Sequence, residues 1–210
     1  MTPQTDIIAQ TTPTTDDFQY SHSIPIHNAL DAVSHITEDM SKTSGILISE
    51  NEGYMIYKSI LDFTMNDYGC IRSAYENPNA SLKDLQRMLA LDQYIRHSPK
   101  WVGSIYRGIS VSAAEAENIA LSTTIDMKGP SSWSNEMPVA ESFAATKDGD
   151  VCILFILKEN KSGVSIAHIS PYEIKESEIL APSGTKYQVN NITESVVNGK
   201  KWMYVFLHEI

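Results

Sequence analysis

The chain has 210 residues, 42% of them hydrophobic, which suffices for the core of one domain or of one domain with a small helical lobe. Its formal net charge is −10, from 26 acidic and 16 basic residues. This charge argues against a surface that binds the phosphate backbone of nucleic acid. It does not argue against a nucleotide ligand, which needs only a few local hydrogen-bond donors.

Cysteine use and hydropathy indicate a reducing, aqueous compartment. Cys70 and Cys152 lie far apart in apolar surroundings, and their spacing fits neither a metal site nor a disulfide framework. No apolar run reaches the roughly 18 residues of a membrane-spanning helix. The N-terminus lacks the charged and apolar segments of a secretory signal. We therefore expect a cytoplasmic protein, in a bacterial or a host cytosol.

The N-terminal segment differs in composition from the rest of the chain. Residues 1–22 are rich in Thr, Gln and Pro and contain no Lys or Arg, which predicts a disordered tail. Two interpretations remain open: a frayed terminus, or a signal for delivery by a phage or a secretion system. We expect residues 23–210 to form a single domain, with a helical lobe over 23–100 and a β-rich core over 101–210.

The first half has helical periodicity. A moderately amphipathic stretch covers about residues 24–40. Ser49 and Glu52 then match the capping-box pattern, in which each side chain binds a free N–H of the first helical turn, and a stronger amphipathic helix follows. A short helix is predicted over about 65–75, and Ser81 begins the next one. The pattern thus predicts a helical first half.

The second half changes to short apolar or alternating runs. These runs cover residues 104–109, 123–127, 151–157, 164–169, 178–181, 187–193 and 202–208. Asn198-Gly199 predicts a tight hairpin turn, since both turn positions require positive φ. One helix interrupts, at about 138–145. Helices first and strands later predict an α+β fold with a largely antiparallel sheet. Neither the GxGxxG nor the Walker A phosphate motif is found.

Arg107 lies in the middle of the apolar run Ile105-Tyr106-Arg107-Gly108-Ile109. A buried guanidinium is costly without a partner, so Arg107 there requires an anion. Gly108 allows close approach of a ligand to the backbone. The alternative is an arginine at a strand edge that extends to water.

Ser132 and Ser134 would share one face of a strand, with Trp133 on the other. Two hydroxyl groups on one face are able to orient a carboxylate. The alternative is an ordinary polar strand end.

Glu176 and Glu178 stand two residues apart at the start of another strand-like run. In a strand, this spacing places two carboxylates on the same face. One acid would stabilise a developing cation while the other orients or deprotonates a nucleophile. The alternative is a pair of solvated carboxylates at a strand edge.

Together, these segments resemble the Arg–Ser–Glu class of mono-ADP-ribosyltransferases. The resemblance rests on Tyr-Arg-Gly, then Ser-x-Ser followed by Ala140 and Phe143, then Glu-x-Glu-Ile-Leu-x-Pro-x-Gly-Thr, and it covers roughly residues 50–210. The class includes bacterial toxins and effectors, vertebrate ecto-transferases and the enzymes that T-even-type phages use on host proteins. It implies a helical lobe packed on a core of two mostly antiparallel β-sheets.

The resemblance implies NAD as co-substrate and assigns its contacts. Arg107 would hold the NAD phosphates, for which a planar guanidinium is well suited. The backbone of Gly108 would receive the nicotinamide carboxamide, and Phe143 would pack on nicotinamide. Ser132 would position the catalytic acid. Tyr68 would lie on a helix that flanks the NAD pocket.

The resemblance also assigns the two acids. Glu178 would bind the 2′-hydroxyl of the nicotinamide ribose and stabilise the oxocarbenium-like state as nicotinamide leaves. Glu176 would orient the acceptor, and a Glu here accompanies arginine as the acceptor. Residues 168–175 would form the substrate-recognition loop, with Tyr172 as its exposed aromatic residue.

Three positions depart from the pattern of the class, and one of them is Tyr172, which lies one residue away from the usual turn aromatic. Trp133 replaces the usual middle Thr, which changes the local hydrogen bonding. Arg72 stands where the class has Asn, and it would either reach a phosphate or face solvent. The histidines show no metal-ligand spacing, so we expect no metal.

The expected activity is therefore transfer of ADP-ribose from NAD to an arginine of a target protein, by a monomer without a membrane partner. Some transferases of this fold modify nucleic acid, and the charge of −10 argues against such an acceptor here. Two alternatives stay open. The chain would be an NAD glycohydrolase if water were the acceptor. It would be a non-catalytic binding module if Trp133 blocked the pocket.

Overall fold

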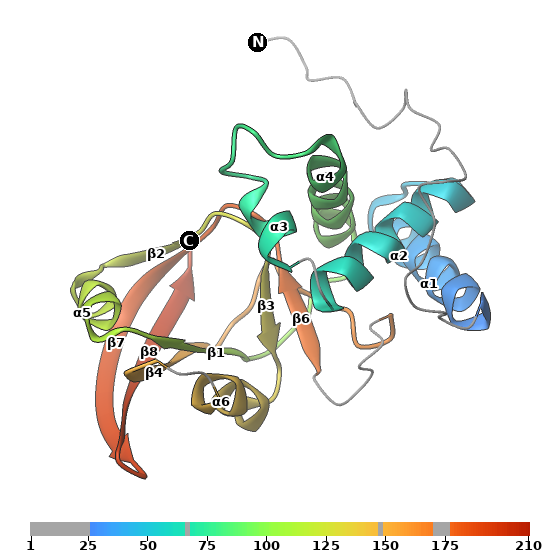
Figure 1. The fold of residues 1–210 in the computed structure, drawn as a ribbon. Helices are drawn as coiled ribbons and strands as arrows, with labels where there is room; N and C mark the ends of the chain where they lie inside the picture. The colour runs from blue at the N-terminus through green and yellow to red at the C-terminus, as the bar shows by residue number, and fades with distance from the viewer. Residues whose placement is uncertain (1–25, 66–67, 147–148, 170–176) are drawn as a thin grey trace.

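The computed structural model describes residues 26–65, 68–146, 149–169 and 177–210. In Figure 1 the helices of the first half lie to one side of a β-rich second half. Helices precede strands along the chain, which confirms the predicted α+β class.

The helical lobe contains α1 (Ile26–Ser44), α2 (Glu50–Met65), α3 (Tyr68–Ser73) and α4 (Leu82–His97). The predicted caps are present. At the start of α2 the Ser49 N–H donates to the Glu52 carboxylate, and the Glu52 N–H donates to Ser49 Oγ. At the start of α4, Ser81 Oγ accepts from the Asp84 N–H. The apolar faces of these helices meet in one buried cluster, hereafter the helical core.

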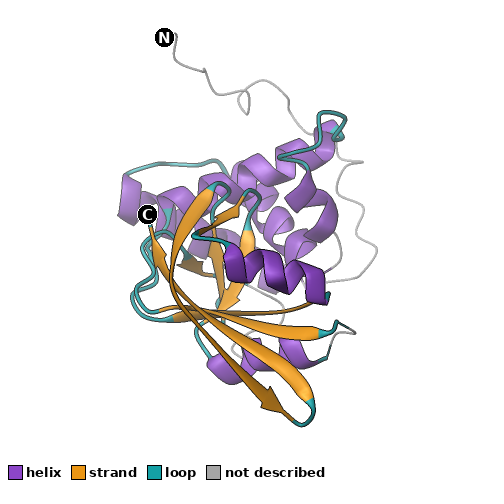
Figure 2. Ribbon diagram, turned by 90° about the vertical axis from the view of Figure 1, so that its left-hand side faces the viewer, coloured by secondary structure: helices purple, strands orange, loops and turns teal. Residues whose placement is uncertain are grey.

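The β-rich half contains eight strands and two helices in the described residues: β1 (Ile105–Val111), α5 (Ala113–Leu121), β2 (Thr124–Met127), β3 (Ser131–Ser134), α6 (Met137–Ala145), β4 (Val151–Leu157), β5 (Val164–Ser165), β6 (Glu178–Ala181), β7 (Thr185–Val197) and β8 (Lys200–Glu209). Their hydrogen-bonded order is β2-β7-β8-β4-β1-β3-β6-β5. Neighbours are antiparallel, apart from the parallel pair β4–β8. Figure 2 shows the strong twist of the long strands.

The two expected sheets are joined into one, which corrects the number of sheets but leaves the fold class unchanged. Strands β1 and β4 pair along all of Ile105–Val111. By contrast, β1 and β3 meet at the single pair Tyr106–Ser134. That pair connects β3, β6 and β5 to the other strands. The sheet is therefore continuous but has a narrow joint between β1 and β3.

Helix α5 departs from the prediction of a single helix in the second half. Its signal was nevertheless in the sequence, because Ser112 and Glu115 form a complete capping box at its start. The hairpin prediction is confirmed. Asn198 and Gly199 connect β7 to β8 with φ values of +51° and +80°.

Strand β6 is buried along its whole length because it lies between two apolar clusters. Leu180 belongs to the helical core. Ile179 and Ala181 belong to a second cluster, hereafter the β core, together with Trp133 and Phe155. Alternate residues of a strand point to opposite faces, so β6 contributes to both cores at once.

Helix α6 packs against β1 so closely that no side chain fits at Gly108. A Cβ atom there would lie 1.7 Å from the carbonyl oxygen of Ala140 and 3.0 Å from the Ala144 nitrogen. The missing side chain therefore sets the distance between α6 and β1.

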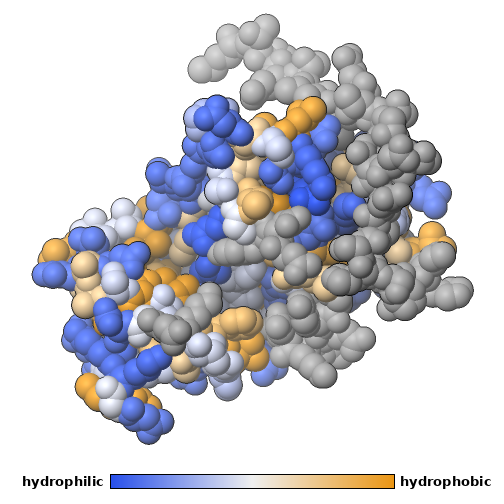
Figure 3. All heavy atoms as spheres, viewed as in Figure 1, coloured by the Kyte–Doolittle hydropathy of each residue, from blue (hydrophilic) through white to orange (hydrophobic). Residues whose placement is uncertain are grey.

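On the face shown in Figure 3, hydrophilic and apolar residues alternate over the described surface. Large exposed apolar side chains, such as Leu47 and Leu121, are spread over separate elements. None of the helices in the described ranges has both the length and the apolar character needed to cross a bilayer.

The double role of β6 predicts a large effect of truncating Leu180. Leu180→Ala should lower the free energy of unfolding by about 2–5 kcal/mol, because it leaves a cavity in the helical core. Leu121→Ala is the matched control, since Leu121 is 77% exposed, and it should change stability by about 0.5 kcal/mol or less. Urea denaturation measures both. Equal losses in the two variants would contradict the placement of β6.

The contact at Gly108 predicts that Gly108→Ala destabilises the protein by about 1–3 kcal/mol or more, because α6 must move away from β1. Gly69→Ala is the control. Gly69 lies in α3 with open space around it, and alanine favours a helix. Thermal unfolding should show a lower Tm for the first variant and an unchanged or higher Tm for the second. Unfolding of Gly108→Ala at the wild-type temperature would contradict the close packing of α6 on β1.

Candidate active site

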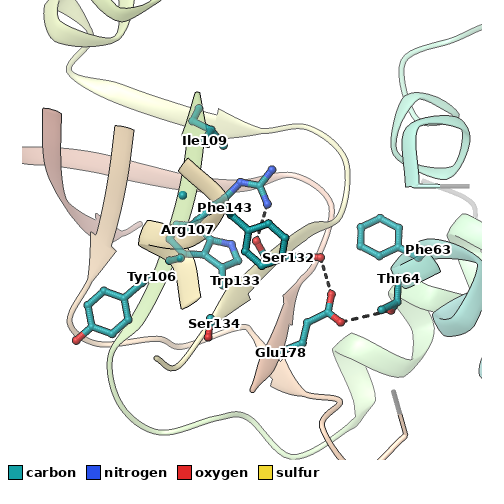
Figure 4. A pocket seen from close by; sticks show the side chains of 12 residues that line it. Phe63, Thr64, Tyr106, Arg107, Ile109, Ser132, Trp133, Ser134, Phe143 and Glu178 are labelled. Carbon is teal, nitrogen blue, oxygen red and sulfur yellow. Dashed lines mark hydrogen bonds between the residues drawn. The ribbon is translucent and has the colours of Figure 1, made fainter. Parts of the chain in front are cut away.

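A pocket of about 210 Å³ lies where the C-terminal end of α2 meets β1, β3, β6 and α6 (Figure 4). It is lined by Phe63, Thr64, Tyr106, Arg107, Gly108, Ile109, Ser132, Trp133, Ser134, Ala140, Phe143 and Glu178. Its volume is below the roughly 300–1,000 Å³ of pockets that enclose a drug-sized ligand. The pocket therefore suits one end of a dinucleotide rather than a whole one.

Glu178, the first residue of β6, is the acidic group of this pocket. Only 5% of its surface is exposed. Ser132 Oγ donates a hydrogen bond of 2.6 Å to Glu178 Oε1. Thr64 Oγ1 lies 3.4 Å from Oε2 and donates to it. The carboxylate is thus held between a serine of β3 and a threonine of α2, as Figure 4 shows.

Arg107 enters the same pocket from β1, and one of its Nη1 hydrogens is donated to the main-chain oxygen of Ser132. This contact ties the arginine to β3, the strand whose Ser132 hydroxyl binds Glu178. The guanidinium carries five N–H donors in a rigid, planar fork. A phosphate oxygen is an acceptor that such a fork binds well.

Two aromatic rings line the pocket from different elements. Phe143, on α6, is 44% exposed and lines the pocket. Phe63, on α2, is 1% exposed and belongs to the helical core. A planar apolar ligand group would cover the exposed face of Phe143.

Five residues singled out from the sequence line this one pocket: Arg107, Gly108, Ser132, Phe143 and Glu178. They come from four elements that are spread over more than seventy positions of the chain. The structure therefore brings together the three motifs that sequence analysis treated separately.

Gly108 has a structural explanation in addition to the predicted one. The space of its missing side chain is filled by the backbone of α6, at Ala140. The close approach that Gly108 permits is thus made by the backbone of α6, whereas the sequence predicted that a ligand would make it. The main-chain groups of Gly108 still line the pocket.

Trp133 and Ser134 have structural contacts. The Trp133 indole packs in the β core against Phe155 and Tyr187, and its Nε1 donates to Ser131 Oγ. Trp133 is therefore part of the pocket wall and does not fill the pocket. Burial raises the pKa of the neighbouring Tyr187 phenol. Ser134 Oγ accepts from the Glu136 N–H, before the first turn of α6.

Glu176 and Tyr172 lie outside the described residues, so their predicted roles stay predictions. The described backbone next to Glu176, at Ser177, is not that of a strand. Strand β6 begins at Glu178, and Ser177 has a φ of +44°, which is outside the extended range. The rule that places residues i and i+2 on one face of a strand therefore does not extend back across Ser177.

The remaining helical assignments concern α3. Tyr68 begins this helix, but its side chain lies outside what the structure describes. Arg72 packs on Gly129 and directs Nη2 toward the sulfur of Met127 at 4.0 Å. Arg72 is not among the residues that line the pocket.

Sequence analysis assigned no site role to Phe63, Thr64 or Tyr106, which also line the pocket. Tyr106 directly precedes Arg107 in its motif. Phe63 and Thr64 closely precede Tyr68, which the resemblance assigned to a helix that flanks the NAD pocket, and this was the available signal. The contact of Thr64 with Glu178 spans 114 positions of the chain, and no local pattern indicates it.

Within the described ranges, no three His, Cys, Asp or Glu side chains cluster as they would around a metal ion. The described charges of the pocket are the Glu178 carboxylate and the Arg107 guanidinium. A carboxylate held in a partly closed pocket is able to stabilise positive charge that develops on a bound ligand, because water screens it little.

The structure is similar to several solved ADP-ribosyltransferases. It matches Vis of Vibrio splendidus in complex with an inhibitor, with a TM-score of 0.64, 18% identity, and coverage of 90% of this chain and 87% of Vis. Plx2a, a toxin of Paenibacillus larvae, matches with a TM-score of 0.60 and 19% identity, over 87% of this chain and 96% of Plx2a. HopU1 of Pseudomonas syringae matches with a TM-score of 0.61 and 15% identity, over 89% of this chain and 89% of HopU1.

No protein-family model and no curated protein sequence matches the chain. At 15–19% identity the structural matches establish the fold, and they extend over about nine tenths of the chain. The chain therefore has the fold of the ADP-ribosyltransferases.

Proposed function

We propose that this protein transfers ADP-ribose from NAD to an arginine side chain of a target protein and releases nicotinamide. The observation that carries the proposal is the Glu178 carboxylate, bound by Ser132 Oγ in a pocket that Arg107 also enters. The order Arg–Ser–Glu along the chain and the fold both support it.

In this proposal Arg107 binds the NAD phosphates and Phe143 covers the nicotinamide ring. A guanidinium is a planar, charged fork whose geometry matches that of a phosphate, and Arg107 places one at this pocket. Phe143 offers an exposed aromatic face at the pocket. The pocket volume suits the nicotinamide ribose end of NAD, with the adenosine end outside.

Glu178 would act on the glycosidic bond between nicotinamide and C1′ of its ribose. Its carboxylate accepts a hydrogen bond from the ribose 2′-hydroxyl and stabilises the oxocarbenium-like state as this bond breaks. The bonding electrons leave with nicotinamide, which departs as a neutral molecule. A nitrogen of the acceptor guanidinium then bonds to C1′ and loses a proton.

The arginine acceptor rests on Glu176, whose carboxylate would orient the guanidinium and ease its deprotonation. One of the similar structures is Vis in complex with agmatine, a small guanidino compound. By analogy we propose a protein arginine as acceptor. Tyr172 would contribute to recognition of the target, which we place in a bacterial or host cytosol, and the enzyme would act as a monomer.

The non-catalytic alternative loses its main support, since Trp133 packs in the β core and leaves the pocket open. The glycohydrolase alternative differs only in using water as the acceptor. It makes a separate prediction for Glu176, given below.

Glu178→Gln keeps the size of the side chain and removes its charge. Nicotinamide release from NAD should fall by about 10²–10⁴-fold, because the oxocarbenium-like state loses its counter-charge. Calorimetry should still detect NAD binding. Glu117→Gln, on the exposed surface of α5, serves as control and should leave the rate unchanged. A wild-type rate in Glu178→Gln would exclude the proposed role.

Glu176→Gln should separate transfer from hydrolysis. With labelled NAD and agmatine, we expect ADP-ribosyl agmatine to fall by about 10²-fold or more while nicotinamide release into water continues. Glu178→Ala should abolish both activities. Unchanged transfer in Glu176→Gln contradicts the arginine assignment, and hydrolysis without any transfer by the wild type favours the glycohydrolase.

A further inference from the structure

We propose that Thr64 is a positioning residue for Glu178, through which the helical lobe orients the catalytic carboxylate. This inference rests on the proposed function for its kinetic consequences. Its structural basis is the contact between Thr64 Oγ1 and Glu178 Oε2 at 3.4 Å, while Ser132 Oγ binds the other oxygen, Oε1, at 2.6 Å. Each carboxylate oxygen thus receives one hydroxyl donor, from opposite sides of the pocket (Figure 4).

Apolar packing fixes the place of Thr64. It is the penultimate residue of α2, and its neighbour Phe63 is buried in the helical core. Leu180, two residues after Glu178 on β6, is buried in the same core. The threonine and the carboxylate are therefore attached to elements that share one packed cluster, so their separation is set by that cluster.

Two donors on separate oxygens determine the rotation of a carboxylate about its last bond. Loss of the Thr64 donor removes one of these contacts and loosens the direction of Oε2. In the proposed function, Oε2 accepts the ribose 2′-hydroxyl. Its contact with Thr64 is longer than the usual 2.5–3.0 Å of an O–H···O bond, so a ribose hydroxyl is able to compete with it or join it.

A hydroxyl donor also favours the charged form of the acid that it binds. Removing the Thr64 hydroxyl should therefore make Glu178 easier to protonate. Among the described residues, the other titratable side chains that line the pocket are Arg107 and Tyr106, both on β1. Beside them, Glu136 accepts a hydrogen bond of 3.5 Å from Ser177 Oγ, next to Glu178. A change at Thr64 leaves all three in place.

The test compares Thr64→Val, which has the same shape without the hydroxyl, with Thr64→Ser, which retains it. We expect Thr64→Val to lower kcat for nicotinamide release about 3–10-fold, as for loss of one modest hydrogen bond, with KM for NAD nearly unchanged. The acid limb of its pH–rate profile should move to higher pH. Thr64→Ser should restore both properties. Thermal unfolding checks that all variants are folded.

A second readout does not depend on activity. Carbon NMR of protein with labelled glutamate follows the titration of the Glu178 carboxylate, identified by its loss in Glu178→Gln. We expect its midpoint to rise in Thr64→Val and to stay near the wild-type value in Thr64→Ser. If the midpoint rises in Thr64→Val but the wild-type protein does not cleave NAD, the positioning contact stands and the proposed function is rejected.

The opposite outcome rejects the role of Thr64 alone. Wild-type protein would cleave NAD, while Thr64→Val matched it in kcat, in pH profile and in the Glu178 titration. The proposal also fails if Thr64→Ser is as impaired as Thr64→Val, because the defect would then follow from packing and not from the hydroxyl.

Discussion

The placement of β6 between two apolar cores is the constraint on which the rest of this structure depends. Leu180 packs with the helices, and Ile179 and Ala181 pack with the sheet. A shift of this strand would disturb both clusters, and each fully buried Leu or Ile contributes about 1.5–3 kcal/mol. Glu178 is the first residue of the same strand. The position of its carboxylate is therefore set by hydrophobic burial.

The pocket that contains this carboxylate lies at the narrow joint between β1 and β3. Strands β1 and β3 share one residue pair, Tyr106–Ser134. Beyond this pair, β1 carries Arg107 and β3 carries Ser132. The Arg107 guanidinium reaches the Ser132 carbonyl, and the Ser132 hydroxyl reaches Glu178. The Arg107 side chain thus joins β1 to β3 beyond their single residue pair.

Much of this arrangement was predictable from local patterns, and the rest depended on contacts between distant segments. Caps and periodicity predicted α2 and α4, and the Asn198-Gly199 turn predicted the β7–β8 hairpin. Helix α5 was missed although Ser112 and Glu115 form its capping box. The joint between β1 and β3 and the Thr64–Glu178 contact had no local signal, because packing of remote elements creates them. Strand alternation fails at Ser177, whose positive φ no pattern indicated.

The central claim is that Glu178, held by hydroxyl groups in this pocket, drives transfer of ADP-ribose to arginine. Mass spectrometry of a bacterial lysate incubated with the protein and NAD tests it most directly, with Glu178→Gln as the parallel sample. The account predicts ADP-ribose adducts on arginine residues in the wild-type sample that are missing from the Glu178→Gln sample. Adducts confined to another residue type, or equally abundant in both samples, would contradict it.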